Sequence, residues 1–161
     1  MKNILLLGAT GSIGTQTLDI IRNHPNEYKL VAFSYGHNTT KAMAIIKEFR
    51  PKLVVTPFPE ELRKIKMMGI KASNEFLDVV KYPIDNAYVV NALVGSVGLI
   101  PTIEAIKNNR ILLLANKESL VMAGELINSL LPKYYSTIVP IDSEHSGLYQ
   151  LLKTVDRSWF Q

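Results

Sequence analysis

The segment Gly8-Ala9-Thr10-Gly11-Ser12-Ile13-Gly14 constrains the fold more than any other part of the chain. It follows the apolar run from Asn3 to Leu7, which is typical of a strand buried on both faces, and precedes apolar positions at helical spacing. In a strand, glycine turn and helix of this order, the first glycine permits a tight turn and the second lets a pyrophosphate approach the backbone. The third lets the helix pack closely on the strand. We interpret the segment as a phosphate site; the alternative is a turn that only connects two elements.

Strands and helices alternate along the rest of the chain, which predicts a parallel sheet. After the first strand and helix, strands are expected at 30–34, 53–55, 87–90, 111–115 and 137–141, and helices at 41–49, 59–68, 99–107, 117–130 and 145–153. Residues 69–86 carry no clear pattern. The sequence therefore predicts an α/β fold with a doubly wound, mostly parallel, Rossmann-like sheet.

Composition excludes several classes of protein. The chain has no cysteine, so disulfide scaffolds, thiolate zinc sites and cysteine nucleophiles are excluded, and a cytoplasmic location is expected. The longest apolar run, Ile111 to Ala115, is far shorter than the roughly 20 residues that span a bilayer. The net charge is +4, and much of the basic excess lies between Lys41 and Lys71 at helical spacing. This spacing favours a solvated helix face over a site for small anions, and either over nucleic acid.

The end of the second predicted strand bears on the choice of dinucleotide. NAD-binding proteins usually carry an Asp or Glu there to hold the ribose 2′-hydroxyl, whereas a 2′-phosphate requires that carboxylate to be absent. This strand ends in Ser34-Tyr35-Gly36-His37-Asn38, without an acidic residue. The sequence therefore favours NADP over NAD. His37 is a candidate phosphate contact, with an exposed loop histidine as the alternative.

Polar residues follow three of the later predicted strands. Asp142-Ser143-Glu144 comes after the last one, where strand alternation would set both carboxylates on one face as ligands for Mg²⁺ or Mn²⁺. The alternative is a solvated turn. Asn116-Lys117-Glu118-Ser119 follows the preceding strand, with helix capping as its alternative, and Asn91 ends the strand before that. Because parallel strands end at one edge of the sheet, these groups together favour a functional site.

Four segments of the chain resemble the 1-deoxy-D-xylulose 5-phosphate reductoisomerase family. They are Gly8 to Gly14, Asn91-Ala92-Leu93-Val94-Gly95, Leu114 to Val121, and Pro140-Ile141-Asp142-Ser143-Glu144-His145-Ser146. The first is shared by many dehydrogenases, whereas the last two together are close to diagnostic. The resemblance implies an enzyme of non-mevalonate isoprenoid biosynthesis that uses NADPH and a divalent metal, Mg²⁺, Mn²⁺ or Co²⁺, to make 2-C-methyl-D-erythritol 4-phosphate.

The resemblance also implies residue roles. NADPH is expected to contact Gly8, Thr10, Gly11, Ser12, Ile13, Gly36, His37, Asn38, Asn116 and Glu118. Lys117 and Glu118 are the expected catalytic residues. The substrate is expected to contact Lys117, Glu118, Ser143 and Glu144. The metal is expected to bind Asp142 and Glu144. Many members carry Lys or Arg where this chain has His37, and a histidine holds less positive charge at neutral pH, so weaker NADP selectivity is expected.

Members of the family are longer than this chain, so the sequence is expected to be an N-terminal fragment. Residues 1–150 would form the NADPH-binding domain and 151–161 the truncated start of a catalytic domain, with Trp159 and Phe160 exposed. The full-length protein is expected to be a homodimer that binds a small phosphorylated sugar, and neither nucleic acid nor a membrane. The alternatives are a dinucleotide-binding domain of another NADP-dependent oxidoreductase and a non-catalytic regulatory or partner module.

Overall fold

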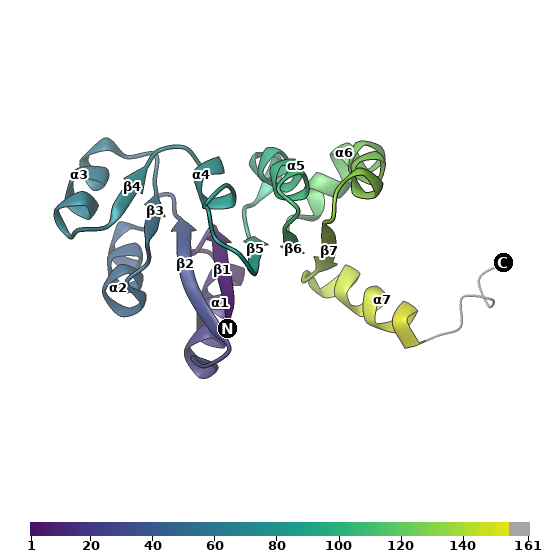
Figure 1. The fold of residues 1–161 in the computed structure, drawn as a ribbon, viewed down its shortest axis with the longest axis horizontal. Coiled ribbons are helices and arrows are strands. Elements are labelled where there is room, and N and C mark those ends of the chain that lie inside the picture. Colours follow the sequence, from purple (N-terminus) through teal and green to yellow (C-terminus); the bar gives the residue numbers. More distant parts are fainter. Residues whose placement is uncertain (155–161) are drawn as a thin grey trace.

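Seven strands pair into one parallel sheet in the computed structural model, which describes residues 1–154 (Figure 1). In chain order they are β1 (Lys2–Leu7), β2 (Tyr28–Ser34), β3 (Leu53–Val55), β4 (Lys71–Ser73), β5 (Ala87–Asn91), β6 (Ile111–Leu114) and β7 (Thr137–Pro140). Their order across the sheet is β4-β3-β2-β1-β5-β6-β7, and every neighbouring pair is parallel. The predicted doubly wound, Rossmann-like sheet is confirmed.

Helices connect the strands and cover both faces of the sheet. They are α1 (Ser12–Asn23), α2 (Thr39–Phe49), α3 (Pro59–Met67), α4 (Leu77–Val80), α5 (Leu99–Lys107), α6 (Lys117–Leu130) and α7 (Ser143–Thr154). Short 3₁₀ turns precede α5 and follow α6, at Gly95–Gly98 and Leu131–Lys133. In Figure 1, α1 and α2 lie on one face of the sheet, and α4, α5 and α6 lie on the other.

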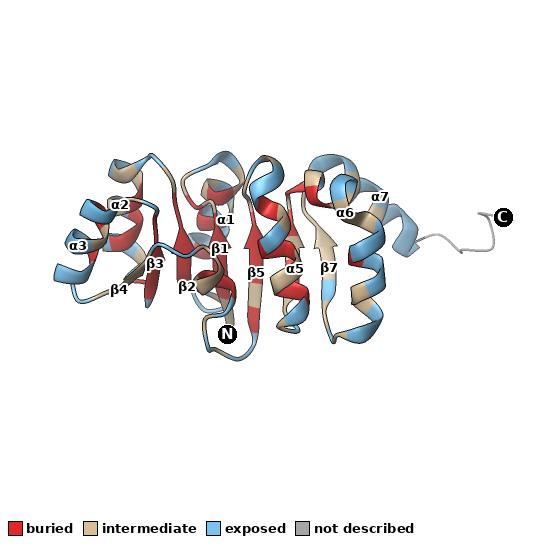
Figure 2. Ribbon diagram, turned by 90° about the horizontal axis from the view of Figure 1, so that it is seen from above, coloured by how far each residue is buried: buried red, intermediate tan, exposed pale blue. Residues whose placement is uncertain are grey.

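Alternation along the strands divides the core into two layers, because successive side chains of a strand point to opposite faces. Leu6 packs with Leu18 of α1 and Ile46 of α2, whereas Leu5 packs with Ala105 of α5 on the other face. Burial is greatest in the central strands and decreases toward β7, whose residues are all half-buried or exposed (Figure 2). The centre of the core therefore lies around β1, β2 and β5.

The chain changes direction across the sheet between β1 and β5. From β1 it proceeds outward through β2 and β3 to β4, then returns to place β5 on the other side of β1. In open parallel sheets the ligand crevice lies at the carboxyl ends of the strands at such a switch point. The glycine segment follows β1 directly, and Ala92, just after β5, donates its N–H to Leu7 O at 3.1 Å. The fold thus puts the glycine segment at the expected crevice.

The structure differs from the sequence predictions at several places, and β2 and α2 begin at Tyr28 and Thr39, each two residues before the predicted start. The unassigned residues 69–86 contain β4 and α4, which consist of only three and four residues and are too short to show a period. The last strand ends at Pro140 and the last helix begins at Ser143, two residues before the predicted start.

The predicted boundary after residue 150 stays a prediction, and Trp159 and Phe160 lie outside the described residues. Among residues 1–154, no helix has both the length and the apolar character needed to cross a bilayer.

Candidate functional site

Two glycines, Gly8 in the loop after β1 and Gly14 in the first turn of α1, are required by the fold itself. Gly8 has a φ of +78°, and a Cβ on it would lie 2.7 Å from the backbone oxygen of Ala92. A Cβ on Gly14 would lie 2.3 Å from the backbone oxygen of Gly8, because α1 packs directly against the start of the loop. Both positions therefore exclude any side chain.

Gly11 is different, because the protein leaves room for a side chain there. Its backbone is extended, with φ −76° and ψ 179°, and a Cβ would make only an ordinary contact of 3.4 Å with Gly8 O. The loop reaches α1 through Gly11, whose carbonyl accepts from the N–H of Thr15 at 2.9 Å. The fold does not explain a glycine at this position, which is consistent with the predicted close approach of a pyrophosphate.

The start of α1 offers unpaired donors beside Gly11. Within residues 1–154, no protein acceptor receives the backbone N–H of Ser12 or of Ile13. The first turn of α1 contains no acidic side chain that could take that place. Free N–H groups and the positive end of a helix form an anion site, so this helix end suits a phosphate.

The end of β2 is hydrogen-bonded to the segment that begins at Gly8 and enters α1, called the glycine loop below. Ser34 accepts hydrogen bonds from two residues of the loop, through its hydroxyl from Gly8 N at 3.2 Å and through its carbonyl from Ala9 N at 2.9 Å. The segment after β2 is exposed at His37 and Asn38, and the His37 ring lies 5.3 Å from the ring of Phe58. The structure therefore brings the two predicted cofactor segments side by side.

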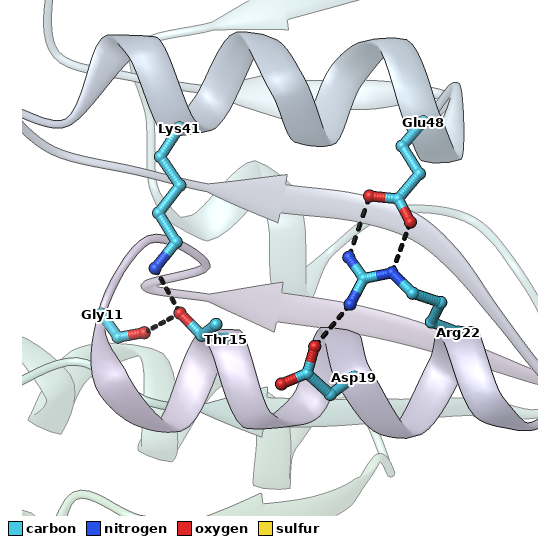
Figure 3. A network of polar contacts seen from close by, with 6 residues as sticks. All are labelled: Gly11, Thr15, Asp19, Arg22, Lys41 and Glu48. Carbon is cyan, nitrogen blue, oxygen red and sulfur yellow. Dashed lines mark hydrogen bonds and ion pairs between the residues drawn. The ribbon is translucent and has the colours of Figure 1, made fainter.

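Helix α2 begins beside this segment and carries a lysine toward the glycine loop. Asn38 caps α2, its Oδ1 accepting from Lys41 N at 3.0 Å. The half-buried Lys41 side chain crosses to the loop, where Nζ donates to Thr10 O at 3.3 Å and to the hydroxyl of Thr15 (Figure 3). The sequence analysis did not single out Lys41, although its place in the first turn after Asn38 was a usable signal.

Asn116 is buried, and its side-chain amide is fully engaged within the protein. Its Nδ2 donates to Leu93 O and Gly95 O, each at 2.9 Å, and its Oδ1 accepts from the N–H and the hydroxyl of Ser119. A Cβ on Gly98 would lie 2.5 Å from the Asn116 carboxamide carbon. The helix-capping interpretation of Asn116 is therefore correct for its side chain, and a contact with a cofactor would use its backbone.

A second buried amide continues this network. Asn91 Nδ2 donates to Gly98 O and to Thr102 Oγ1, each at 2.9 Å, and Thr102 Oγ1 lies 3.4 Å from Ser119 Oγ. All of these side chains are buried. The chain of contacts joins the end of β5 to the start of α6, so the loop 92–98 and the segment at Asn116 are held as one unit.

Lys117 and Glu144 connect the ends of β6 and β7. Lys117 Nζ lies 3.7 Å from Glu144 Oε1, and both side chains are largely exposed. The pKa of Glu144 lies below its ordinary value. The backbone N–H of Glu144, the Ser143 hydroxyl and the positive charge of Lys117 all stabilise its ionised form. Three of the residues expected at the substrate, Lys117, Ser143 and Glu144, thus come together at one edge of the sheet.

Asp142 is a helix cap as well as a candidate ligand. Its Oδ1 accepts from the backbone N–H of His145 at 2.9 Å and lies 2.8 Å from the His145 ring nitrogen Nδ1. Burial alone would raise the pKa of this carboxyl, but the hydrogen bonds from His145 outweigh it and hold the pKa below its ordinary value. Asp142 is therefore an anion that is held in place.

The prediction that strand alternation aligns Asp142 with Glu144 is wrong. β7 ends at Pro140, and Glu144 lies in the first turn of α7. Both residues still supply the hard carboxylate oxygens that Mg²⁺ and Mn²⁺ prefer. No cluster of three or more His, Cys, Asp or Glu suited to a metal occurs in the part of the chain that the structure describes. The two carboxylates fit a divalent metal as part of its ligand set.

The sequence pattern of one protein family, 1-deoxy-D-xylulose 5-phosphate reductoisomerase, matches residues 4–124. The chain belongs to this family. The predicted resemblance is confirmed, and the alternative of a dinucleotide-binding domain from an unrelated oxidoreductase is excluded.

Relatives and solved structures agree with the family match. A 1-deoxy-D-xylulose 5-phosphate reductoisomerase from Bacillus cereus (strain AH187) is 46% identical over 157 residues, covering 94% of this chain and 41% of the relative. A crystal structure of DOX-P reductoisomerase with NADPH, fosmidomycin and magnesium is 40% identical, with a TM-score of 0.84, covering 93% of this chain and 38% of that one. The Zymomonas mobilis reductoisomerase with NADPH is 30% identical, with a TM-score of 0.83, covering 92% and 41%. The chain thus spans about two fifths of its relatives' length.

In this chain the predicted site residues form two groups along one edge of the sheet. The glycine loop and residues 36–38 lie at β1 and β2, whereas Lys117, Asp142, Ser143 and Glu144 lie at β6 and β7. Three strand spacings, about 14 Å in total, separate β1 from β7. Asn116 and Glu118 flank Lys117 at the start of α6, so they belong to the second group.

Proposed function

We propose that this chain is the NADPH-binding part of a 1-deoxy-D-xylulose 5-phosphate reductoisomerase. The observation that carries the proposal is the glycine loop at the switch point of the sheet, where a Cβ on Gly11 would come no nearer to the protein than 3.4 Å. Beside it the N–H groups of Ser12 and Ile13 have no acceptor within residues 1–154. The loop from Gly8 to Ile13 would hold the cofactor's phosphates through these backbone donors, with Thr10 at its outer turn.

The residues after β2 would hold the adenosine end of NADPH. Ser34, at the end of β2, accepts hydrogen bonds from the glycine loop. This places the next residues, Gly36, His37 and Asn38, beside that loop. No carboxylate occurs from Ser34 to Asn38, so a 2′-phosphate would meet no repulsion there. Backbone groups of Asn116 and the side chain of Glu118 would extend the site toward the nicotinamide.

The edge at β6 and β7 would hold the metal and the substrate. Asp142 and Glu144 are both anionic and would supply two oxygen ligands to Mg²⁺, Mn²⁺ or Co²⁺. Lys117, Ser143 and Glu118 would contact a phosphorylated sugar, and Lys117, as a cation at the same edge, would help to orient it. A metal bound here would supply polarisation of substrate oxygens and NADPH would supply a hydride, so this chain's task would be binding and orientation.

The full-length enzyme would convert 1-deoxy-D-xylulose 5-phosphate to 2-C-methyl-D-erythritol 4-phosphate, but the chain alone would bind NADPH without turnover. It spans 41% of the Bacillus cereus relative, and residues 1–154 contain no group of three metal-ligating side chains. Positioning of reactants accounts for roughly 7–11 kcal/mol of barrier reduction in enzymes, and most of a substrate pocket would come from the remainder of the protein.

We further propose that the full-length protein is a cytoplasmic homodimer that acts on a small molecule and not on nucleic acid. The absence of cysteine supports the location, and the helical spacing of the basic residues argues against nucleic acid, whereas the homodimer rests on the family resemblance.

Two measurements test the proposal. NADPH fluorescence in a titration with the chain should change saturably, and NADPH absorbance with substrate and Mg²⁺ should stay constant. Unaltered emission at high protein concentration would favour a non-catalytic partner module instead. Metal-dependent oxidation of NADPH that Asp142→Ala abolishes would show that the chain is sufficient for catalysis.

A further inference from the structure

Two cations lie between α1 and α2, and their surroundings differ. Arg22, near the end of α1, pairs with Asp19 and with both oxygens of Glu48 (Figure 3). Lys41, at the glycine-loop end, donates only to Thr10 O and the hydroxyl of Thr15, which are neutral. Within residues 1–154 no carboxylate lies within ion-pair distance of Lys41. One cation is therefore neutralised inside the protein, and the other is not.

The position of Lys41 is electrostatically unfavourable unless an anion is present. The residue lies in the first turn of α2, and its ammonium reaches the first turn of α1, so it faces the positive ends of two helices. Neither first turn contains an acidic residue. A cation at a helix N-terminus is disfavoured, whereas an anion there is stabilised. Three sources of positive potential thus converge without a protein anion to balance them.

The location of this charge is specific. Lys41 follows Asn38 by one helical turn and is fixed to it by the cap hydrogen bond, while its Nζ contacts the glycine loop. The ammonium therefore lies between the loop after β1 and the loop after β2. In dinucleotide-binding folds this is the region of the adenosine ribose, where an acidic side chain accepts the 2′-hydroxyl of NAD and a basic one accommodates the 2′-phosphate of NADP.

We propose that Lys41 is the residue that gives this chain its preference for a dinucleotide with a 2′-phosphate. The inference rests on the proposed binding of NADPH and adds the group that distinguishes it from NADH. A lysine ammonium has three donors, and two of those on Lys41 have neutral partners, so one is available to a phosphate oxygen. This assignment supplies a full positive charge close to the segment in which this chain has the exposed His37.

The test compares the dissociation constants of NADPH and NADH for four forms of the chain, by fluorescence and calorimetry. Lys41→Met keeps the length of the side chain and removes the charge, and it should weaken NADPH about tenfold to hundredfold while NADH binding stays within about threefold. Lys41→Arg should keep the preference. Lys47→Met is the matched control, because Lys47 is an exposed lysine in the last turn of the same helix, and it should bind both as the unaltered chain does.

Thermal unfolding of each variant checks that it is folded, and the outcomes separate the two proposals. If Lys41→Met weakens NADPH and NADH equally, Lys41 only shapes the glycine loop and the inference is overturned, while NADPH binding stands. If Lys41→Met changes neither dissociation constant, the inference is equally overturned. If the unaltered chain binds neither dinucleotide, the proposed function itself fails. If Lys41→Met loses the preference for NADPH over NADH and Lys41→Arg keeps it, the assignment is supported.

Discussion

Replacement of Gly11 by valine tests the glycine loop most directly, because binding and stability should respond differently. The backbone at Gly11 is extended and open to any residue, and a Cβ there would meet only Gly8 O at an ordinary distance of 3.4 Å. The expected cost in unfolding free energy is about 1 kcal/mol, from placing an apolar residue at the cap of α1. In a domain of this size that cost lowers the melting temperature by roughly 2–4 °C.

Binding should fall much further. The branched side chain of valine would occupy the space in front of the N–H groups of Ser12 and Ile13, where the pyrophosphate is expected. Loss of two hydrogen bonds to a charged group amounts to about 3–6 kcal/mol, so NADPH affinity should decrease at least about hundredfold.

Calorimetric titration gives the NADPH affinity, and a thermal melt of the same sample gives the melting temperature. Two other glycine variants serve for comparison. Gly124→Ala, in open space on α6, should change neither, whereas Gly14→Ala should unfold the chain because its Cβ would lie 2.3 Å from Gly8 O. Unchanged NADPH affinity in Gly11→Val would refute the assignment of the loop. A loss of affinity accompanied by a collapse of the melting temperature would refute the claim that the fold tolerates a side chain there.

Three further outcomes are expected. Asn116→Ala leaves three buried or partly buried partners of its amide unpaired and should lower the unfolding free energy by about 2–4 kcal/mol, measured in urea. A change below about 1 kcal/mol would contradict the network. Arg22 lowers the pKa of Glu48, so this half-exposed pair stabilises the fold above the ordinary carboxyl pKa and loses that effect as the pH falls through the lowered value. Glu48→Gln should therefore cost under about 1 kcal/mol at pH 7 and progressively less as the pH falls through the lowered pKa of Glu48, and a larger loss in acid than at pH 7 would contradict this sign. Mg²⁺ should bind weakly, in the millimolar range or above, and Asp142→Ala should abolish its heat of binding; tight binding would show that two carboxylates suffice.

The order of strands and helices was predictable wherever the apolar pattern was long enough to show its period. β1 and α1 are of this kind, whereas β4 has three residues, one of them exposed, and shows no period at all. The start of α7 was placed too late because the prediction extended the strand alternation beyond residue 141 to Asp142 and Glu144, although Asp is a favourable helix cap. Local sequence thus placed these candidate residues at one edge of the sheet but did not predict their backbone conformation.

Long-range contacts account for what the sequence could not predict in the site. Lys41 reaches Thr15 across 26 residues, and Asn116 reaches Leu93 across 23. No local pattern reports such distances, because they depend on which strands become neighbours in the sheet. The capping role of Asn116 was predictable from its place before a helix, whereas the full use of its amide was not.

The decrease in burial from β1 toward β7 has a consequence for the order in which the molecule opens. No residue of β7 or α7 is fully buried, so these elements can detach at a lower free-energy cost than the central strands. Their amides should exchange with solvent through local opening, while those of β1 and β5 should exchange only on global unfolding. Asp142 and Glu144 lie in this weakly held segment. A bound metal would therefore stabilise its closed form and slow the exchange of its amide hydrogens, while exchange in the glycine loop would not change.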